Sequence, residues 1–487
     1  MLARPIFIGG TASHVGKSWV ATALCRYLYR MGYRVAPFKA QNMSNNSMAC
    51  AGGEIGRAQA AQAEACGIVP QTDMNPILLK PTGTLGSQVV LKGQPWKTLK
   101  PVEYYEHFDF LLEQVWASYA RLARQYEFVI VEGAGSITEL NLKQRDLVNL
   151  GLAARLAAPC ILVADIDRGG VFASVVGTFQ LLDETESLLV RSFLVNKFRG
   201  DPALFQDGVR ILEEKTGRPC LGVFPFSEEI SLDPEDSLSL EDGTVRSAAA
   251  SQQFMASSSV AIVRFPHISN FTDFRLLRDA IYVSSPAEKK FDVVILPGTK
   301  STIEDLLWLR ATGLETWLFD QIRHGARVIG ICGGYQMLGE EIVDPYGVES
   351  PVRAVRGLGL LRARTHLSQT KITRPVSATT PSGTRFEAYE IHMGLTIVDG
   401  NYPPFADLDE GVPDGVRAGQ TIGTYLHGAL ENKRVLEELL GHPLPFETAS
   451  SKDGEYDRLA DWFSQHVNQD VLFTEYISTE KRYQVSS

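Results

Sequence analysis

The sequence has few cysteines and no arrangement of them that binds metal or forms a disulfide framework. Six cysteines occur in 487 residues, without a C-x-x-C pair or zinc-type spacing. We expect five of them to be small buried side chains in a reducing cytoplasm. The first 18 residues lack the apolar segment of a secretory signal, and no apolar run approaches the roughly 18 residues that cross a bilayer. The sequence therefore predicts a cytoplasmic protein with no membrane partner.

Excess positive charge is also absent. Lysine and arginine total 47 against 57 aspartates and glutamates, a net charge of -10, which argues against a nucleic-acid-binding protein. Local basic pockets for phosphate remain compatible with this balance. Hydrophobic residues make up 44% of the chain, as is typical of globular proteins. A chain of this length predicts about two to four domains.

Short β-branched runs alternate with helical patterns over residues 1–226. This alternation predicts an α/β domain with βαβ units, a mostly parallel sheet and helices on both faces. The helical patterns cover residues 17–31, 104–125 and 202–216. The expected strands are 6–9, 34–38, 128–132, 160–165, 192–196 and 221–224.

The remainder of the chain divides into three parts. Residues 227–259 are acidic, turn-rich and then small and polar, which favours a linker between domains over one long surface loop. Residues 260–445 begin a second α/β series and become richer in β-type residues. Residues 446–487 are polar, and we expect a peripheral helix near 456–466 followed by a tail.

A glycine-rich loop follows the first expected strand and precedes a helical pattern. The segment GGTASHVGKS aims backbone N–H groups at phosphate oxygens, with Lys17 reaching the terminal phosphates of ATP and Ser18 binding Mg²⁺. Thr11 stands where the usual first glycine would be and Gly10 precedes it, so the loop up to Gly16 is one residue longer than the standard form. This variant resembles the dethiobiotin synthetase branch of P-loop proteins, which implies carboxylate activation by ATP.

Acidic residues near strand ends are candidates for metal binding. Glu132 ends a strongly apolar strand, where open parallel sheets bind ligands, and therefore suits a Mg²⁺ ligand. Glu54, on an apparent helix GEIGRAQAAQAEA, is a weaker candidate for a second ligand. In DIDRGG, Asp167 and Arg168 follow another strand and could contact an anionic substrate, although a purely structural turn fits nearly as well.

An amide-rich segment follows the second expected strand. The run KAQNMSNNS is too polar for a core and suits recognition of a substrate that carries carboxylates and amides; a solvated loop without a task is the alternative. The candidate substrate residues are Lys39, Gln41, Asn42, Asn45 and Asn46.

Cys332 lies at a strand-to-helix elbow, RVIGICGGYQML. Glycines around it permit a tight turn, and the helix N-terminus favours the reactive thiolate. His427, in TYLHG, closes another expected strand and is the candidate base.

Together, GICGGYQMLG and TYLHG resemble the class I (triad-type) glutamine amidotransferases, which implies a flavodoxin-like glutaminase domain. The resemblance assigns the oxyanion hole to Gly298 or Thr299, in LPGTKST, and to Gly333. Many members carry H-x-E, but Ala429 occupies the place of that acid. The acid is therefore missing or comes from elsewhere, such as Glu387 or Glu390.

A synthetase domain of this kind followed by a triad-type glutaminase resembles the cobyrinic and cobyric acid amidases over nearly the whole chain. KAQNMSNNS and ADIDRGGVFAS favour the cobyric acid synthase family. That resemblance implies ATP- and glutamine-dependent amidation of the b, d, e and g carboxylates of adenosylcobyrinic acid a,c-diamide, a corrinoid precursor. The alternatives are an a,c-diamide synthase and a non-catalytic partition-type ATPase. The sequence predicts no nucleic-acid partner and leaves the oligomeric state open.

Overall fold

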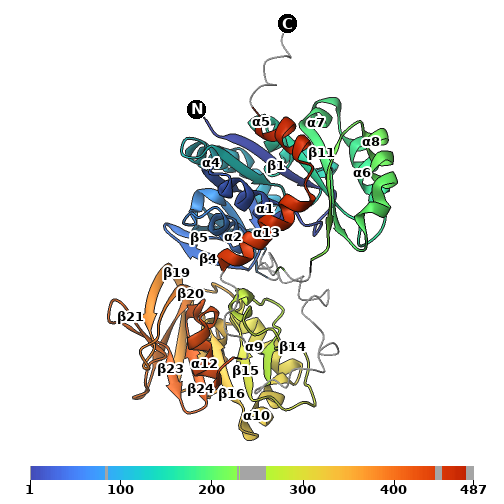
Figure 1. Ribbon diagram of the computed structural model, residues 1–487. Helices are drawn as coiled ribbons and strands as arrows, with labels where there is room; N and C mark the ends of the chain where they lie inside the picture. Colours follow the sequence, from blue (N-terminus) through green and yellow to red (C-terminus); the bar gives the residue numbers. More distant parts are fainter. Residues whose placement is uncertain (1, 83–85, 228–229, 231–258, 445–451, 479–487) are drawn as a thin grey trace.

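The computed structural model describes residues 2–82, 86–227, 230, 259–444 and 452–478, and Figure 1 shows them as two α/β bodies. The first body is built on a sheet in the order β12-β11-β10-β1-β9-β2, and all its neighbouring strands run parallel. This confirms the predicted parallel sheet. Its strands are β1 (Arg4–Gly10), β2 (Val35–Phe38), β9 (Phe128–Glu132), β10 (Cys160–Asp165), β11 (Val190–Phe198) and β12 (Cys220–Pro225).

Helices cover this sheet because its strands are mostly apolar and most of their residues are buried. Among the described residues, no helix combines the length and apolar character needed to cross a bilayer. The helices of this body are α1 (Lys17–Arg30), α2 (Arg57–Ala65), α3 (Pro101–Glu106), α4 (Phe108–Ala123), α5 (Leu150–Leu156), α6 (Val171–Leu181), α7 (Glu184–Leu189) and α8 (Gln206–Thr216).

The amide-rich segment is not a loop, contrary to expectation. It forms β3 (Gln41–Met43), which pairs with β6 (Ile77–Pro81), and then β4 (Ser47–Cys50). β4 pairs with β5 (Gly53–Gly56), so Glu54 lies on a strand instead of the predicted helix. The close approach of this hairpin to Gly93 requires Gly53, which has φ 145° and whose Cβ would lie 2.1 Å from the Gly93 carbonyl oxygen. β7 (Ser87–Leu91) and β8 (Gln94–Leu99) complete the small sheet with β3 and β6.

The second body has a six-stranded sheet in the order β14-β13-β15-β16-β24-β23. Its strands run parallel except for β23, which pairs antiparallel with β24. The strands are β13 (Val260–Val263), β14 (Ile281–Val283), β15 (Val293–Leu296), β16 (Arg327–Ile331), β23 (Val416–Ala418) and β24 (Thr421–Thr424). Its helices are α9 (Thr302–Ala311), α10 (Leu314–Arg323), α11 (Gly333–Leu338) and α12 (Lys433–Leu440).

A second sheet of this body contains a long hairpin, β19 (Ala363–Thr379) and β20 (Arg385–Val398). The hairpin contacts β4 and β5 of the first body, and Figure 1 shows these strands meeting at the junction. The remaining strands are β17 (Glu341–Val343), β18 (Ala354–Arg356), β21 (Ala406–Leu408), β22 (Pro413–Asp414) and β25 (Leu426–His427).

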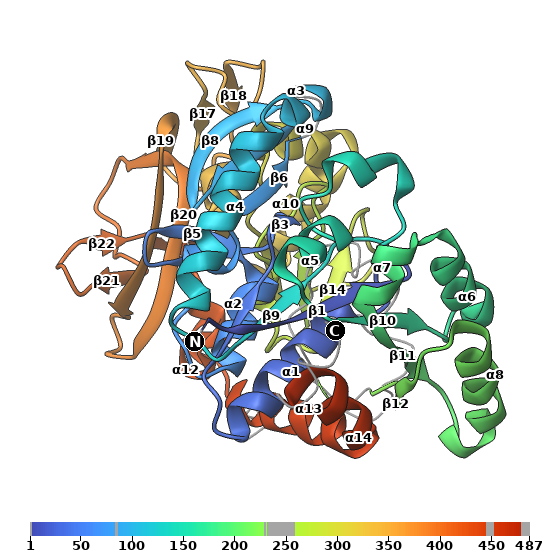
Figure 2. The same ribbon diagram turned by 90° about the horizontal axis from the view of Figure 1, so that it is seen from above.

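The C-terminal helices return to the first body. α13 (Lys452–His466) lies alongside α1 in both views (Figures 1 and 2), followed by α14 (Gln469–Leu472) and a π-helical turn (Phe473–Ile477). Phe463 is fully buried between Tyr27 and Phe224. The expectation of a peripheral helix is therefore wrong: an amphipathic segment completes a core that lies far from it in sequence. Most of the predicted linker, residues 227–259, lies outside the described residues.

Candidate functional site

The glycine-rich loop joins β1 to α1 at the carboxyl edge of the first sheet. The Thr11 N–H donates to the Val163 carbonyl oxygen at 3.0 Å, which fixes the start of the loop after Gly10. Gly16 has φ 100°, and α1 begins directly after it with Lys17 and Ser18. The buried Lys17 ammonium donates to the carbonyl oxygens of Ala12 and Gly135, both at 2.9 Å. All five predicted ATP-binding residues therefore belong to one loop and the helix turn that follows it.

Glu132 is fully buried at the end of β9, beside this loop. Its Oε1 accepts hydrogen bonds from the Ser18 hydroxyl and the Lys39 ammonium, each at 2.8 Å. The Gln62 side chain donates to the other carboxylate oxygen at 2.5 Å. A hydroxyl and a carboxylate in contact fit Mg²⁺, which binds through few protein oxygens and keeps several waters. The predicted pair Ser18 and Glu132 therefore lies together.

Glu54 lies in a different environment from the one expected of a metal ligand. It is fully buried, and one of its oxygens accepts a hydrogen bond from the Lys80 ammonium at 2.8 Å. The Lys371 ammonium of the second body binds the other oxygen. These two cations outweigh burial and hold the pKa of Glu54 well below its usual range. Both oxygens are thus engaged by lysines, and the assignment of Glu54 as a second Mg²⁺ ligand stays a prediction.

The amide side chains mostly support the fold around these sites. Asn42 donates to the Gln59 side chain at 3.0 Å, and Gln41 accepts a hydrogen bond from the Tyr104 hydroxyl. Asn46 accepts from the Thr272 hydroxyl of the second body at 3.4 Å. The buried Asn45 side-chain oxygen accepts no hydrogen bond from the part of the chain that the structure describes. Asn45 therefore remains the member of this segment best placed to bind a ligand.

Lys39 and the DIDRGG residues occupy separate places. Lys39 lies at the phosphate loop through its ion pair with Glu132, not in a separate substrate loop. Asp167 is ion-paired with Arg199 at 2.5 Å, and Arg168 is exposed on the same turn after β10. Their assignment to substrate binding stays a prediction.

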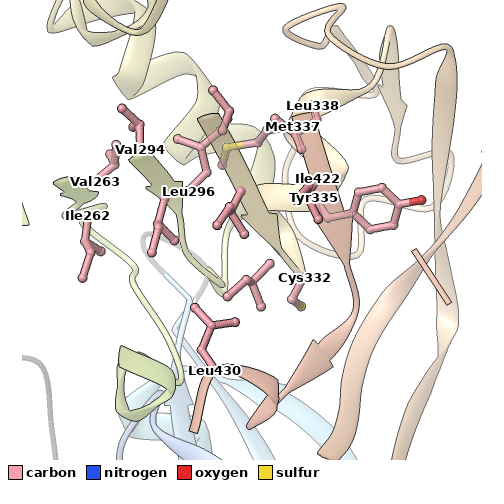
Figure 3. Close-up of a cluster of buried hydrophobic side chains, with 14 of the residues drawn as sticks. Ile262, Val263, Val294, Leu296, Cys332, Tyr335, Met337, Leu338, Ile422 and Leu430 are labelled. Atoms are coloured by element: carbon pink, nitrogen blue, oxygen red, sulfur yellow. The ribbon is translucent and has the colours of Figure 1, made fainter. Parts of the chain in front are cut away.

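Cys332 lies directly after β16, at the start of α11, with φ 52° and ψ -109°. Figure 3 shows it at the edge of a buried cluster that includes Leu296 and Tyr335. Its N–H donates to the Thr424 carbonyl oxygen at 2.8 Å, and its Sγ lies 3.4 Å from the Ile391 carbonyl oxygen. A left-handed conformation of a non-glycine residue costs free energy, and the surrounding packing sustains it. The strand-to-helix elbow predicted for the nucleophile is therefore present.

The predicted oxyanion residues surround this elbow. A Cβ on Gly298 would lie 2.9 Å from Cε1 of His427, so only glycine permits the ring to approach. A Cβ on Gly333 would lie 3.1 Å from the Thr299 backbone nitrogen. The Thr299 hydroxyl donates to the buried Asp305 carboxylate, which anchors the turn. The structure thus brings Gly298, Thr299 and Gly333 together beside Cys332 and His427.

His427 is fully buried, and its orienting acid is Asp273. The His427 Nδ1–H donates to the Asp273 carboxylate at 2.7 Å, and the Gly428 N–H donates to its other oxygen at 2.8 Å. Burial alone would lower the pKa of His427, but Asp273 and the Cys332 side chain outweigh it and raise that pKa to about 10. These three residues have the arrangement expected of a nucleophile, a base and an orienting acid.

Asp273 was missed in the sequence because it lies 154 residues before His427. It follows β13 on a short helical turn, Phe271–Phe274, whose two phenylalanines are buried. In the sequence, the available signal for Asp273 is an acidic residue between two phenylalanines that are expected to be buried. Glu387 and Glu390 do not serve: Glu387 accepts from the Ser377 hydroxyl, and Glu390 pairs with Arg374 and His392.

Known protein families match both bodies. Residues 6–240 match the model described as the CobQ/CobB/MinD/ParA nucleotide binding domain. Residues 259–435 match the CobB/CobQ-like glutamine amidotransferase domain. We therefore refer to the two bodies as the synthetase domain and the glutaminase domain.

Curated relatives resemble the chain over nearly its whole length. The cobyric acid synthase of Syntrophobacter fumaroxidans is 44% identical, over 96% of this chain and 97% of that protein. That of Bacteroides fragilis is 43% identical over 96% and 98%, and that of Moorella thermoacetica is 44% identical over 90% and 89%. Because both domains and the full-length identity agree, this chain belongs to the cobyric acid synthase family.

Proposed function

We propose that this chain uses ATP and glutamine to amidate the b, d, e and g carboxylates of adenosylcobyrinic acid a,c-diamide, yielding adenosylcobyric acid in cobalamin biosynthesis. The observation that carries the proposal is the buried group Cys332–His427–Asp273, in a chain that also contains the phosphate loop. Full-length relatives named cobyric acid synthase support the choice of acceptor. A non-catalytic ATPase would have no use for such a nucleophile.

The glutaminase domain supplies the nitrogen. The Cys332 thiolate attacks the carboxamide carbon of glutamine, and the N–H groups of the 298–299 turn and of Gly333 stabilise the oxyanion. His427, held by Asp273, donates its proton to the departing ammonia. Water then hydrolyses the thioester to glutamate, with His427 as the base. A raised pKa keeps His427 protonated until that proton is needed.

The synthetase domain activates the acceptor. A carboxylate is a poor acyl donor, so ATP first phosphorylates it to an acyl phosphate; ammonia then attacks the acyl carbon and phosphate leaves. The loop N–H groups and Lys17 would hold the ATP phosphates, and Lys39 adds positive charge beside Glu132. Ser18 and Glu132 would hold Mg²⁺, which supplies further compensation for phosphate charge.

Two substitutions test the division of labour, with glutamate release and corrinoid amidation as readouts. In Cys332→Ser we expect glutamine-dependent amidation to fall at least ~10³-fold while free ammonia still supports the reaction. Lys17→Ala should lose amidation with either nitrogen source, because it contacts the phosphate loop.

Loss of both activities in Cys332→Ser would contradict separate sites. The acceptor is tested in the wild-type protein by comparing the a,c-diamide with cobyrinic acid. A preference for cobyrinic acid would instead identify an a,c-diamide synthase.

A further inference from the structure

The pocket that contains Cys332 and His427 extends beyond the residues that the thioester chemistry uses. Its lining includes two further charged groups of the glutaminase domain, Lys300 and Glu349, which that chemistry leaves without a role. It also includes Lys371 of the hairpin and Lys80 of the synthetase domain. The pocket therefore includes these four charged side chains beside Cys332 and His427.

Two of these lysines already have a carboxylate partner. The Lys80 ammonium donates to Glu54 and to the Ser47 hydroxyl, each at 2.8 Å, and Lys371 binds the other Glu54 oxygen. One buried carboxylate thus faces two ammonium groups. Burial lowers the pKa of Lys371 to about 7 even though Glu54 attracts its charge. Glu54 alone therefore does not balance the charge of Lys80 and Lys371.

Unlike Lys80 and Lys371, Lys300 makes no direct polar contact through its ammonium within the described part of the chain. Among the residues that the structure describes, none forms a hydrogen bond with its ammonium or an ion pair within 4.0 Å. Burial lowers the pKa of Lys300; Glu349 opposes that shift, and Lys80 adds to it. A half-buried ammonium that makes no direct hydrogen bond or ion pair gains from a ligand that supplies an anion.

The backbone places Lys300 in the same pocket as Cys332. It follows the oxyanion residues Gly298 and Thr299 directly, and its N–H donates to the His267 carbonyl oxygen at 3.0 Å. The Ser301 N–H donates to the Thr299 hydroxyl oxygen at 3.1 Å, which closes the turn. A ligand bound by the Lys300 ammonium would therefore lie within the pocket of Cys332.

Glu349 supplies the opposite charge in the same pocket. Its Oε2 accepts the Thr302 N–H at 2.9 Å, which positions the carboxylate at the start of α9. Burial raises the pKa of Glu349, although Lys300 opposes that shift. A carboxylate in this position gains from a cationic ligand. Together, the two side chains complement a zwitterion.

We infer that Lys300 binds the α-carboxylate of glutamine and Glu349 its α-ammonium, while the side-chain amide reaches Cys332. Glutamine carries one group of each charge and a carboxamide at the other end, which matches the pocket. This inference rests on the proposed glutaminase activity and assigns the groups that make it selective for a free α-amino acid. Charge-assisted hydrogen bonds provide such selectivity.

The first test is the glutamine dependence of glutamate release. We expect Lys300→Met and Glu349→Gln each to raise KM by about 10- to 100-fold, the effect of losing a hydrogen bond to a charged group. Lys290→Met, which removes an exposed lysine of the same domain, is the matched control and should leave KM unchanged. A KM unchanged in Lys300→Met would overturn the inference.

The second test uses glutamine analogues and does not depend on absolute activity. The α-amide of glutamine lacks the carboxylate, and glutaramate lacks the ammonium. The wild-type enzyme should prefer glutamine to both. Lys300→Met should no longer prefer glutamine to its α-amide. Glu349→Gln should no longer prefer glutamine to glutaramate. Variants that retain these preferences contradict the assignment, even if their activity is reduced.

Failure of this inference is distinguishable from failure of the proposed function. A wild-type protein that releases no glutamate would refute the glutaminase itself. If glutamate is released but Lys300→Met also loses amidation from free ammonia, its effect is on the fold and the assignment is wrong. A normal melting temperature of Lys300→Met, with a raised KM for glutamine alone, supports the assignment.

Discussion

At the scale of single residues, Asp273 determines how His427 can act. The imidazole ring is buried, where a positive charge is unfavourable, and the neighbouring carboxylate reverses that preference. Asp273 also accepts the Gly428 N–H, so the same side chain fixes the ring and the backbone that carries it. Orientation and charge therefore depend on one carboxylate.

We expect Asp273→Asn to lower the glutaminase kcat by about 10²- to 10⁴-fold, because an amide keeps the shape but not the charge. The pKa of His427 is raised by Asp273, so the substitution should lower it. In the variant, His427 would then lose its proton at a lower pH than in the wild type. Alkylation of Cys332 by iodoacetamide should therefore be slower than in the wild type at neutral pH.

The pH profile of that alkylation shows in which direction the substitution shifts the pKa of His427. The wild-type rate should be nearly constant through neutral pH, since His427 stays protonated up to about pH 10, whereas the variant rate should climb with pH. Asp279→Asn, at an exposed position beyond the same turn, is the control. Identical profiles for Asp273→Asn and wild type would refute the role of Asp273.

At the scale of elements, α13 belongs to the core of the synthetase domain. Phe463 packs against Tyr27 of α1 and Phe224 of β12, and Trp462 packs against Trp19. α1 begins with Lys17, so the helix that carries the lysine predicted to bind phosphate is supported by α13. The nucleotide site depends on packing that comes from a distant segment.

Phe463→Ala should therefore reduce the free energy of unfolding of the synthetase domain by about 3–5 kcal/mol, the usual cost of removing a buried aromatic ring. Denaturant unfolding, monitored by the loss of ATP binding, measures this change in the free energy of unfolding. Phe473→Ala, in the same C-terminal segment but 37% exposed, should change stability far less. Equal effects of the two substitutions would show that α13 does not contribute to this core.

The sequence predicts features that depend on neighbouring residues. The glycine loop before Lys17 and the elbow at Cys332 are local, and their backbone requirements are visible in the residues themselves. Asp273 is not predictable in this way, because its role arises only when β13 lies beside β15 and the turn after it reaches His427. The sequence predicts a helix at Glu54 because the alanine-rich helix α2 follows directly and hides the short strand β5 in the pattern.

At the scale of the whole molecule, the chain crosses between the domains twice. It passes from β12 to β13 through the region of residues 227–259, and from α12 back to α13. Side chains also join the domains directly: Glu54 binds Lys371, Arg57 lies 3.4 Å from Glu431, and the Tyr389 hydroxyl donates to the Ser47 carbonyl oxygen at 3.4 Å. The domains are thus joined by packing as well as by sequence.

We expect the two fragments to remain associated after cleavage at a protease site inserted between residues 231 and 258. α13 travels with the glutaminase fragment but packs in the synthetase domain, so cutting this connection leaves its contacts intact. Gel filtration at micromolar concentration should show one particle. The same cut in a chain that ends at residue 444 should weaken the association, and separate elution of the full-length fragments would contradict the expectation.

The return of α13 to α1 also has a consequence for synthesis on the ribosome. The segment that covers the helix after the phosphate loop is the last described part of the chain to emerge, after the entire glutaminase domain. The synthetase core therefore stays incomplete until its ammonia-producing partner has been translated. A prematurely terminated product without the glutaminase domain would also lack the helix that stabilises its nucleotide site, so the two activities mature together.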